Sequence, residues 1–121
     1  MLPGPALPDE PLTMLVDDVR LFRDDRPCLV ARTSADAVAL LRSLRGRHIA
    51  HLWLDHDLIG DDDIWPVVRL LEDAHLRGEP LDVGLVHVHA ARTGPARRMV
   101  VSLRRAGYPV ERFVDLRTWT R

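Results

Sequence analysis

Short apolar runs alternate with longer amphipathic stretches along the chain. The apolar runs have the length of strands, and the longer stretches repeat apolar residues every three or four positions, as a buried helix face does. We therefore predict strands at residues 13–16, 28–31, 49–54, 83–88 and 110–114, and helices within residues 33–46, 61–78 and 95–107. Residues 19–27 are too few and too polar for a full crossover helix.

Particular side chains mark the expected helix ends. Thr33 is a candidate N-cap, with Asp36 three residues later as its partner in a capping box. Three aspartates at residues 61–63 stand where the second helix would begin, and their charges favour the helix dipole there. Pro95 suits the first turn of the third helix.

This order of elements predicts an α/β fold. Strands alternating with helices form mainly parallel sheets with right-handed crossovers. We predict a flavodoxin-like, doubly wound three-layer sandwich, with five strands in the order 2-1-3-4-5 and a shortened first crossover. Residues 1–11 contain four prolines and are expected to form a flexible leader, and residues 12–121 a single domain.

Composition narrows the possible functions. The net charge of −1 gives no general attraction to polyanions, so extended DNA binding is not expected. The single cysteine, Cys28, rules out a disulfide within the chain. Neither a signal peptide nor an apolar run of membrane length is visible, so we expect a cytoplasmic protein that does not bind membranes.

Acidic residues follow two of the predicted strands. Asp17 and Asp18 end the first strand, and Asp55 ends the apolar run that starts at Ile49. In the predicted strand order these ends lie side by side, where open α/β sheets bind ligands. The three carboxylates therefore form a candidate site for Mg²⁺ or another divalent cation. The alternative is that they are ordinary loop and cap acids.

Histidines lie at the same predicted edge. His56 follows Asp55 directly, and His89 ends the fourth strand. Two histidines on opposite sides of a phosphate ester could act as an acid–base pair. His51 is interpreted as a structural core residue, whereas His87 could either orient a partner or fill space.

Arginines supply candidate phosphate ligands. Arg20, Arg32 and Arg92 each follow a predicted strand on the ligand side. Planar guanidinium groups match phosphate oxygens well. Any one of them could instead be a solvated surface arginine, but three at one rim favour a phosphate-containing ligand.

Four short motifs stand at or near the ends of the predicted strands: D-D-x-R at 17–20, A-R-T at 31–33, L-D-H-D-L at 54–58 and H-A-A-R-T-G at 89–94. Together they resemble the motifs of the cyclic-phosphate processing receiver-like domain family. The resemblance runs from about residue 13 to 114 and implies a receiver-like fold with activity on cyclic phosphates. It also implies functional roles for the acidic pair, Arg20 and His89, and for the central motif Asp55-His56-Asp57.

The loop after His89 departs from the family pattern. The family continues with a serine, an asparagine-proline pair and a glycine-arginine pair, whereas Ala90, Arg92 and Thr93 stand here. Arg92 would then replace a phosphate contact, or the activity would be weaker.

Three functional hypotheses follow. The leading one is a phosphoesterase-type hydrolase that opens or transfers a cyclic phosphate on a nucleotide, an RNA end or a related metabolite. In it Asp17, Asp18 and Asp55 hold the cation, while His56, Asp57 and His89 are the catalytic residues. The second is a non-catalytic pseudo-receiver that binds a protein or a nucleotide. The third is phosphoacceptor signalling through Asp55, which the absence of any lysine disfavours. Pairing of two copies through the last helix and strand is expected only by analogy.

Overall fold

The computed structural model describes residues 11–114 and 116–119. The predicted flexible leader lies outside the described residues, apart from the exposed Pro11. Among the described residues, no helix combines the length and the apolar composition that crossing a membrane requires.

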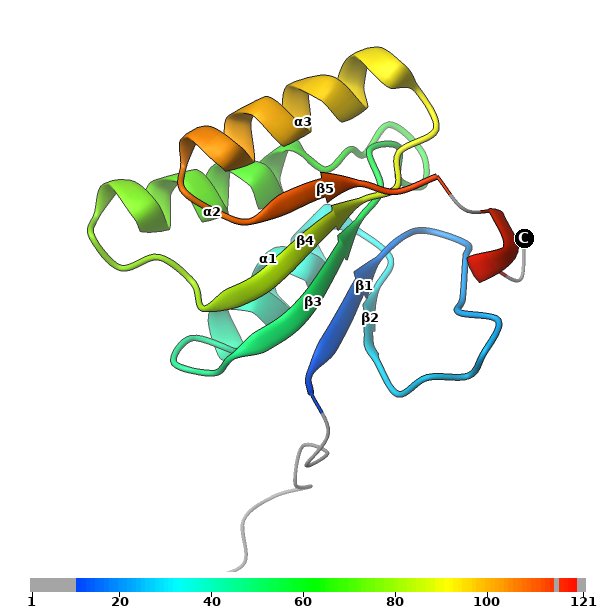
Figure 1. Ribbon diagram of the computed structural model, residues 1–121, viewed down its shortest axis with the longest axis horizontal. Helices are drawn as coiled ribbons and strands as arrows, with labels where there is room; N and C mark the ends of the chain where they lie inside the picture. Colours follow the sequence, from blue (N-terminus) through cyan, green and yellow to red (C-terminus); the bar gives the residue numbers. More distant parts are fainter. Residues whose placement is uncertain (1–10, 115, 120–121) are drawn as a thin grey trace, which may run out of the picture.

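Five parallel strands form one sheet in the order β2-β1-β3-β4-β5 (Figure 1). The strands are β1 (Thr13–Val16), β2 (Leu29–Ala31), β3 (Ile49–Leu54), β4 (Val83–Val88) and β5 (Val110–Arg112). The helices are α1 (Ser34–Ser43), α2 (Trp65–Leu76) and α3 (Thr93–Arg105), and a short 3-10 helix, η1 (Leu116–Thr118), follows β5. The predicted α/β receiver-like fold, its strand order and its helix-free first crossover are confirmed.

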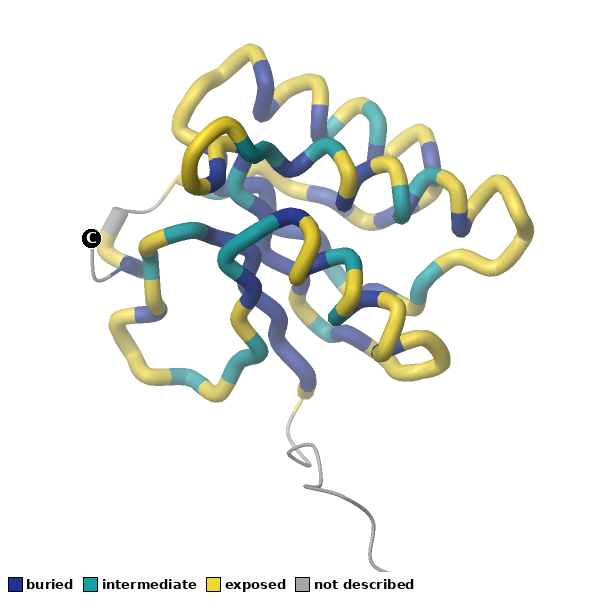
Figure 2. The backbone as a smooth tube through the Cα atoms, turned by 180° about the vertical axis from the view of Figure 1, so that it is seen from behind, coloured by how far each residue is buried: buried dark blue, intermediate teal, exposed yellow. Residues whose placement is uncertain are grey.

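The three helices lie together on one face of the sheet. Each crossover from β2 onwards moves in the same direction across the sheet, so right-handed connections place α1, α2 and α3 side by side (Figure 1). Leu52 and Leu54 of β3 and Val86 and Val88 of β4 point into this helical layer and are buried there. Seen from the helical side, the strands lie buried behind helices with exposed outer surfaces (Figure 2).

The opposite face of the sheet has no helical layer among the described residues. A small aromatic cluster covers it: Leu15 and Trp53 from the sheet, Phe22 from the loop at residues 17–28, and Trp119 after η1. Phe22 and Trp119 form an antiparallel bridge, and their rings stack at 4.9 Å. The third layer of the sandwich therefore consists of a loop and a short turn.

Local signals were correct at some helix ends and wrong at others. The Thr33 side chain accepts a hydrogen bond from the Asp36 N–H at 3.1 Å, so the predicted N-cap is confirmed. The second helix begins at Trp65 and not at the three aspartates. Asp62 instead accepts the N–H of Ser34 at the start of α1, and Asp63 accepts the N–H of Trp65.

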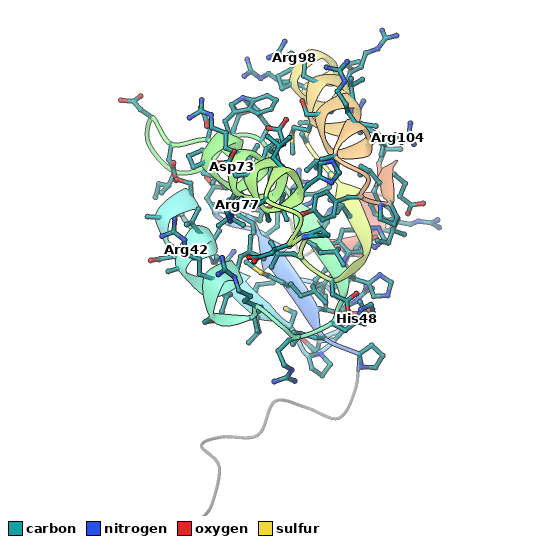
Figure 3. The ribbon with its side chains drawn as sticks, turned by 90° about the vertical axis from the view of Figure 1, so that its left-hand side faces the viewer. Arg42, His48, Asp73, Arg77, Arg98 and Arg104 are labelled. Atoms are coloured by element: carbon teal, nitrogen blue, oxygen red, sulfur yellow. The ribbon has the colours of Figure 1, made fainter. Side chains whose placement is uncertain are left out.

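Arginines line the outer surface of the helical layer. Arg42 on α1, Arg77 next to α2, and Arg98 and Arg104 on α3 project from this side, with Asp73 among them (Figure 3). They are exposed, as the amphipathic pattern predicts, and they lie on the opposite side of the sheet from the aromatic cluster.

Candidate functional site

The ends of three neighbouring strands bring the candidate site together. Asp17 follows β1, Asp55 follows β3 and His89 follows β4. Main-chain hydrogen bonds extend the sheet to these residues: the Asp55 N–H donates to the carbonyl of Val16 at 3.1 Å, and the His89 N–H to that of Leu54 at 3.0 Å. The backbone therefore fixes where all three side chains start.

Asp17 and His89 form a fully buried pair. Nε2 of His89 lies 2.9 Å from Oδ2 of Asp17, and the two side chains are 1% and 0% exposed. The other oxygen of Asp17 accepts the N–H groups of Val19 and Arg20, each at 2.9 Å. Three donors thus converge on one buried carboxylate and hold it in place.

These contacts set the protonation state of the pair. Burial alone would raise the pKa of Asp17, but the hydrogen bonds from His89, Arg20 and Val19 together lower it. Burial lowers the pKa of His89 more than its bond to Asp17 raises it. The pair is therefore a carboxylate that accepts a hydrogen bond from a neutral imidazole, with the proton on Nε2. Nδ1 of His89 is buried and has no hydrogen-bond partner among the described residues.

Asp55 lies in an environment that opposes its charge. Burial, and then the negative charge of Asp17, raise its pKa to about 7, against the opposing effects of the His56 N–H and Arg20. The charge of Asp18 contributes a smaller part of this rise in pKa. Two carboxylates so placed repel one another unless a proton or a cation lies between them.

The site fits a divalent cation. Asp17, Asp55 and His89 each offer a ligand atom, and these atoms all lie within 4.8 Å of one another. Carboxylates suit Mg²⁺, and His89 would add an imidazole ligand for a transition metal such as Mn²⁺ once the ligating nitrogen is free of its proton. Asp18, also predicted as a ligand, is partly exposed and does not belong to this group, although its charge acts on Asp55.

A second group of predicted residues forms a rim beside the buried pair. Nδ1 of His56 lies 2.9 Å from Oδ1 of Asp57, and the Arg92 guanidinium donates to the same oxygen at 3.3 Å. The main-chain N–H of His56 donates to Asp55 at 2.8 Å, which links the rim to the centre. The hydrogen bonds of the His56 ring thus go to Asp57, not to the Asp17–His89 pair.

The other two predicted arginines occupy different positions. NH1 of Arg32 donates to the main-chain carbonyls of Asp17 at 3.0 Å and Arg20 at 2.8 Å, so it braces the loop after β1. Arg20 itself lies over the Trp119 ring, with its guanidinium carbon 5.8 Å from the ring centroid. Both arginines remain candidate phosphate ligands.

The prediction that His51 is a core residue is wrong. His51 is exposed, because no helix within residues 11–114 and 116–119 covers the sheet face it occupies, and its Nδ1 lies 2.9 Å from Nε2 of His87. His87 is buried, stacks on Trp53 at 3.9 Å, and has its pKa lowered to about 4 by burial and by His51. The burial of His87 and its stacking on Trp53 favour the space-filling role.

Sequence reasoning missed one wall of the site. A cavity of about 240 Å³ adjoins His89, and its lining includes Arg112, Phe113 and Trp119 from the C-terminal part of the chain. Arg112 donates to the carbonyl of Ala90 at 3.2 Å, which fastens β5 to the loop after β4. No sequence signal indicated Arg112, because the predicted fifth strand runs to residue 114 and puts Arg112 in its middle, whereas the observed β5 ends at Arg112 on the edge where all five strand ends meet.

The fold and the site together define a receiver-like α/β domain with a buried acidic centre at the carboxyl edge of its sheet. A family model described as "Cyclic-phosphate processing Receiver domain" matches residues 12–105, and the chain belongs to this family. No curated protein and no solved structure gives a significant match.

Proposed function

We propose that the domain hydrolyses or transfers a cyclic phosphate on a nucleotide, an RNA end or a related metabolite, as a phosphoesterase-type enzyme. The observation that carries this proposal is the buried Asp17–His89 pair next to Asp55. The family name gives the substrate chemistry its direction. A buried pair facing a carboxylate of raised pKa is typical of catalytic sites.

The His89–Asp17 pair supplies the base. Because Nε2–H donates to Asp17, the bare Nδ1 can accept a proton from a water or hydroxyl that attacks phosphorus. Asp17 fixes the tautomer and favours the imidazolium that forms, as the aspartate of a serine protease triad does. One ester P–O bond of the ring then breaks, and the departing oxygen takes a proton.

His56 is the proposed counterpart that supplies this proton, with Asp57 orienting its ring. Arg20, Arg32 and Arg92 are proposed to hold the phosphate oxygens, where positioning and charge provide much of the rate gain. A divalent cation held by Asp17 and Asp55, with the charge of Asp18 nearby, would neutralise negative charge that develops on the phosphate oxygens.

A turnover screen tests the proposal. The purified protein is incubated with cyclic-phosphate nucleotides and nucleotide sugars, with Mg²⁺ or Mn²⁺ or with a chelator. We expect turnover that the chelator and the variants Asp55→Asn and His89→Ala abolish. Asp61→Asn is the matched control, because Asp61 is an exposed carboxylate in the loop before α2. Unchanged turnover in both site variants, in properly folded protein, would overturn the proposal.

The second candidate is a non-catalytic pseudo-receiver that binds a protein or a nucleotide. The observation in its favour is the altered loop after His89, where Arg92 is engaged with Asp57 at 3.3 Å. Tight binding without metal and without turnover would support it, and reverting Arg92 to asparagine should then restore activity. The cytoplasmic location, the absence of extended DNA binding and the pairing of two copies stay predictions.

A further inference from the structure

A cavity of about 240 Å³ opens beside the buried pair, between the loop after β1 and the end of β5. Its charged lining residues are Arg20 and Arg112, and no carboxylate lines it among the described residues. Phe113 and Trp119 add apolar surface. The lining of the cavity therefore combines two positive charges with apolar surface.

One residue that lines the cavity, His89, has a buried ring nitrogen without a hydrogen-bond partner among the described residues. His89 lines the cavity, its side chain is 1% exposed, and its Nδ1 has no hydrogen-bond partner among the described residues. Buried polar atoms without partners are rare in folded proteins, and each one calls for an explanation. A ligand in the cavity would lie next to this histidine ring.

The two arginines come from opposite walls and keep free donors. Arg20 lies over the Trp119 ring and has no carboxylate partner among the described residues. Arg112 donates one hydrogen bond to the Ala90 carbonyl, and its other guanidinium N–H groups remain available as donors. Guanidinium forks recognise phosphate oxygens in pairs, so an anionic phosphate ester matches these walls.

The volume and the aromatic surface of the cavity restrict the kind of ligand that it can hold. Pockets for drug-sized ligands have volumes of roughly 300–1,000 Å³, so a cavity of about 240 Å³ suits one small unit and not an oligomer. The half-buried Phe113 ring packs edge-on against Trp53 and offers aromatic surface on which a base can lie. Arg112, Phe113 and Trp119 all follow residue 105, where the family match ends.

We propose that this cavity binds a single nucleotide. The base lies against Phe113, Arg20 and Arg112 hold phosphate oxygens, and the phosphate lies next to His89. This inference rests on the proposed function, because it places a substrate phosphate next to the proposed base. It assigns the substrate class as mononucleotides with a cyclic phosphate, ahead of nucleotide sugars or long RNA.

Binding measured without metal and without turnover tests the assignment. Calorimetric titrations in chelator use adenosine 3′-monophosphate, adenosine and inorganic phosphate as probes. We expect the monophosphate to bind most tightly and Arg112→Gln to weaken it about tenfold or more, as the loss of a charge-assisted hydrogen bond does. Phe113→Leu should weaken the monophosphate and adenosine but leave inorganic phosphate unchanged. The control Arg97→Gln, exposed on α3, should leave all three unchanged.

Two results would overturn the assignment: inorganic phosphate that binds as tightly as the monophosphate, or Arg112→Gln that binds every probe as Arg97→Gln does. Failure of this assignment can be distinguished from failure of the proposed phosphoesterase function. Nucleotide binding that depends on Arg112, in a protein that turns over no cyclic phosphate, would contradict the function and support the cavity. Turnover of cyclic nucleotides that is the same in Arg112→Gln and Phe113→Leu would contradict the cavity and support the function.

Discussion

Replacing Asp55 by asparagine should stabilise the metal-free protein while it removes the proposed cation site. The carboxyl group has its pKa raised from 3.8 to about 7, chiefly by burial and by the charge of Asp17. The folded protein therefore retains a proton that the unfolded chain has lost between about pH 4 and pH 7. Stability must fall as the pH rises through this window, and the full loss applies above pH 7. An asparagine is neutral at every pH and escapes this loss.

The size of the pKa shift of Asp55 sets the expected gain in the free energy of unfolding. Each pKa unit corresponds to about 1.4 kcal/mol, so three units set an upper limit of about 4 kcal/mol. Asp55 is only partly buried, and solvent screens part of its repulsion, which reduces the expected gain to about 1–2 kcal/mol at pH 8. For a domain of this size that corresponds to a rise in Tm of about 4–8 °C. The asparagine Oδ1 can still accept the His56 N–H, so the substitution preserves that hydrogen bond.

Thermal and urea unfolding of wild type and Asp55→Asn, with chelator at pH 5 and pH 8, measures the effect. We expect the advantage of the variant to be small at pH 5 and larger at pH 8. Mn²⁺ should raise the Tm of the wild type but not that of the variant. Asp61→Asn should behave as wild type at both pH values. A variant whose advantage does not grow with pH, or which is less stable than wild type at pH 8, would refute the reasoning.

Three further substitutions separate the roles of single residues. Asp17→Asn should reverse the tautomer of His89 and therefore lower kcat, measured per folded molecule, by about 10²–10⁴, as the equivalent change does in serine proteases. A near-normal kcat would contradict the assigned tautomer. Arg32→Gln removes two hydrogen bonds to the loop after β1, so we expect amide exchange of residues 19–22 to accelerate about tenfold or more, and unchanged exchange would argue against the bracing role. Tyr108→Phe removes the buried hydrogen bond to the carbonyl of Leu71 and should cost about 1–2 kcal/mol in urea unfolding without affecting turnover; a loss of turnover would mean that the helical layer acts on the site.

The strands and their order were predictable because parallel sheets leave a strong sequence signal. Buried parallel strands read as continuous apolar runs, and each crossover of this length admits one handedness. Once the order was fixed, the ends of β1, β3 and β4 had to meet, which placed Asp17, Asp55 and His89 together before the structure was known. Their position at one edge is thus a consequence of topology.

Features that depend on the opposite face of the sheet were not predictable. The exposure of His51 follows from the lack of a helix over that face in the described part of the chain, and no local pattern in its strand indicates this. Trp119 packs on Phe22 from nearly a hundred residues away in the sequence, and Arg112 lines the cavity because the observed β5 ends at this residue. The late start of α2 was not predictable either, because it depends on another helix. The Asp62 side chain accepts a hydrogen bond from the N–H of Ser34 at the start of α1.

We propose that the centre formed by Asp17, Asp55 and His89 opens a cyclic phosphate. ³¹P NMR of adenosine 2′,3′-cyclic monophosphate mixed with the protein and Mn²⁺ observes this step directly. We expect the cyclic resonance to be replaced by that of a phosphomonoester with wild type and Asp61→Asn, but to persist with His89→Ala and Asp55→Asn. Conversion at the wild-type rate in folded His89→Ala and Asp55→Asn would contradict this role of the centre.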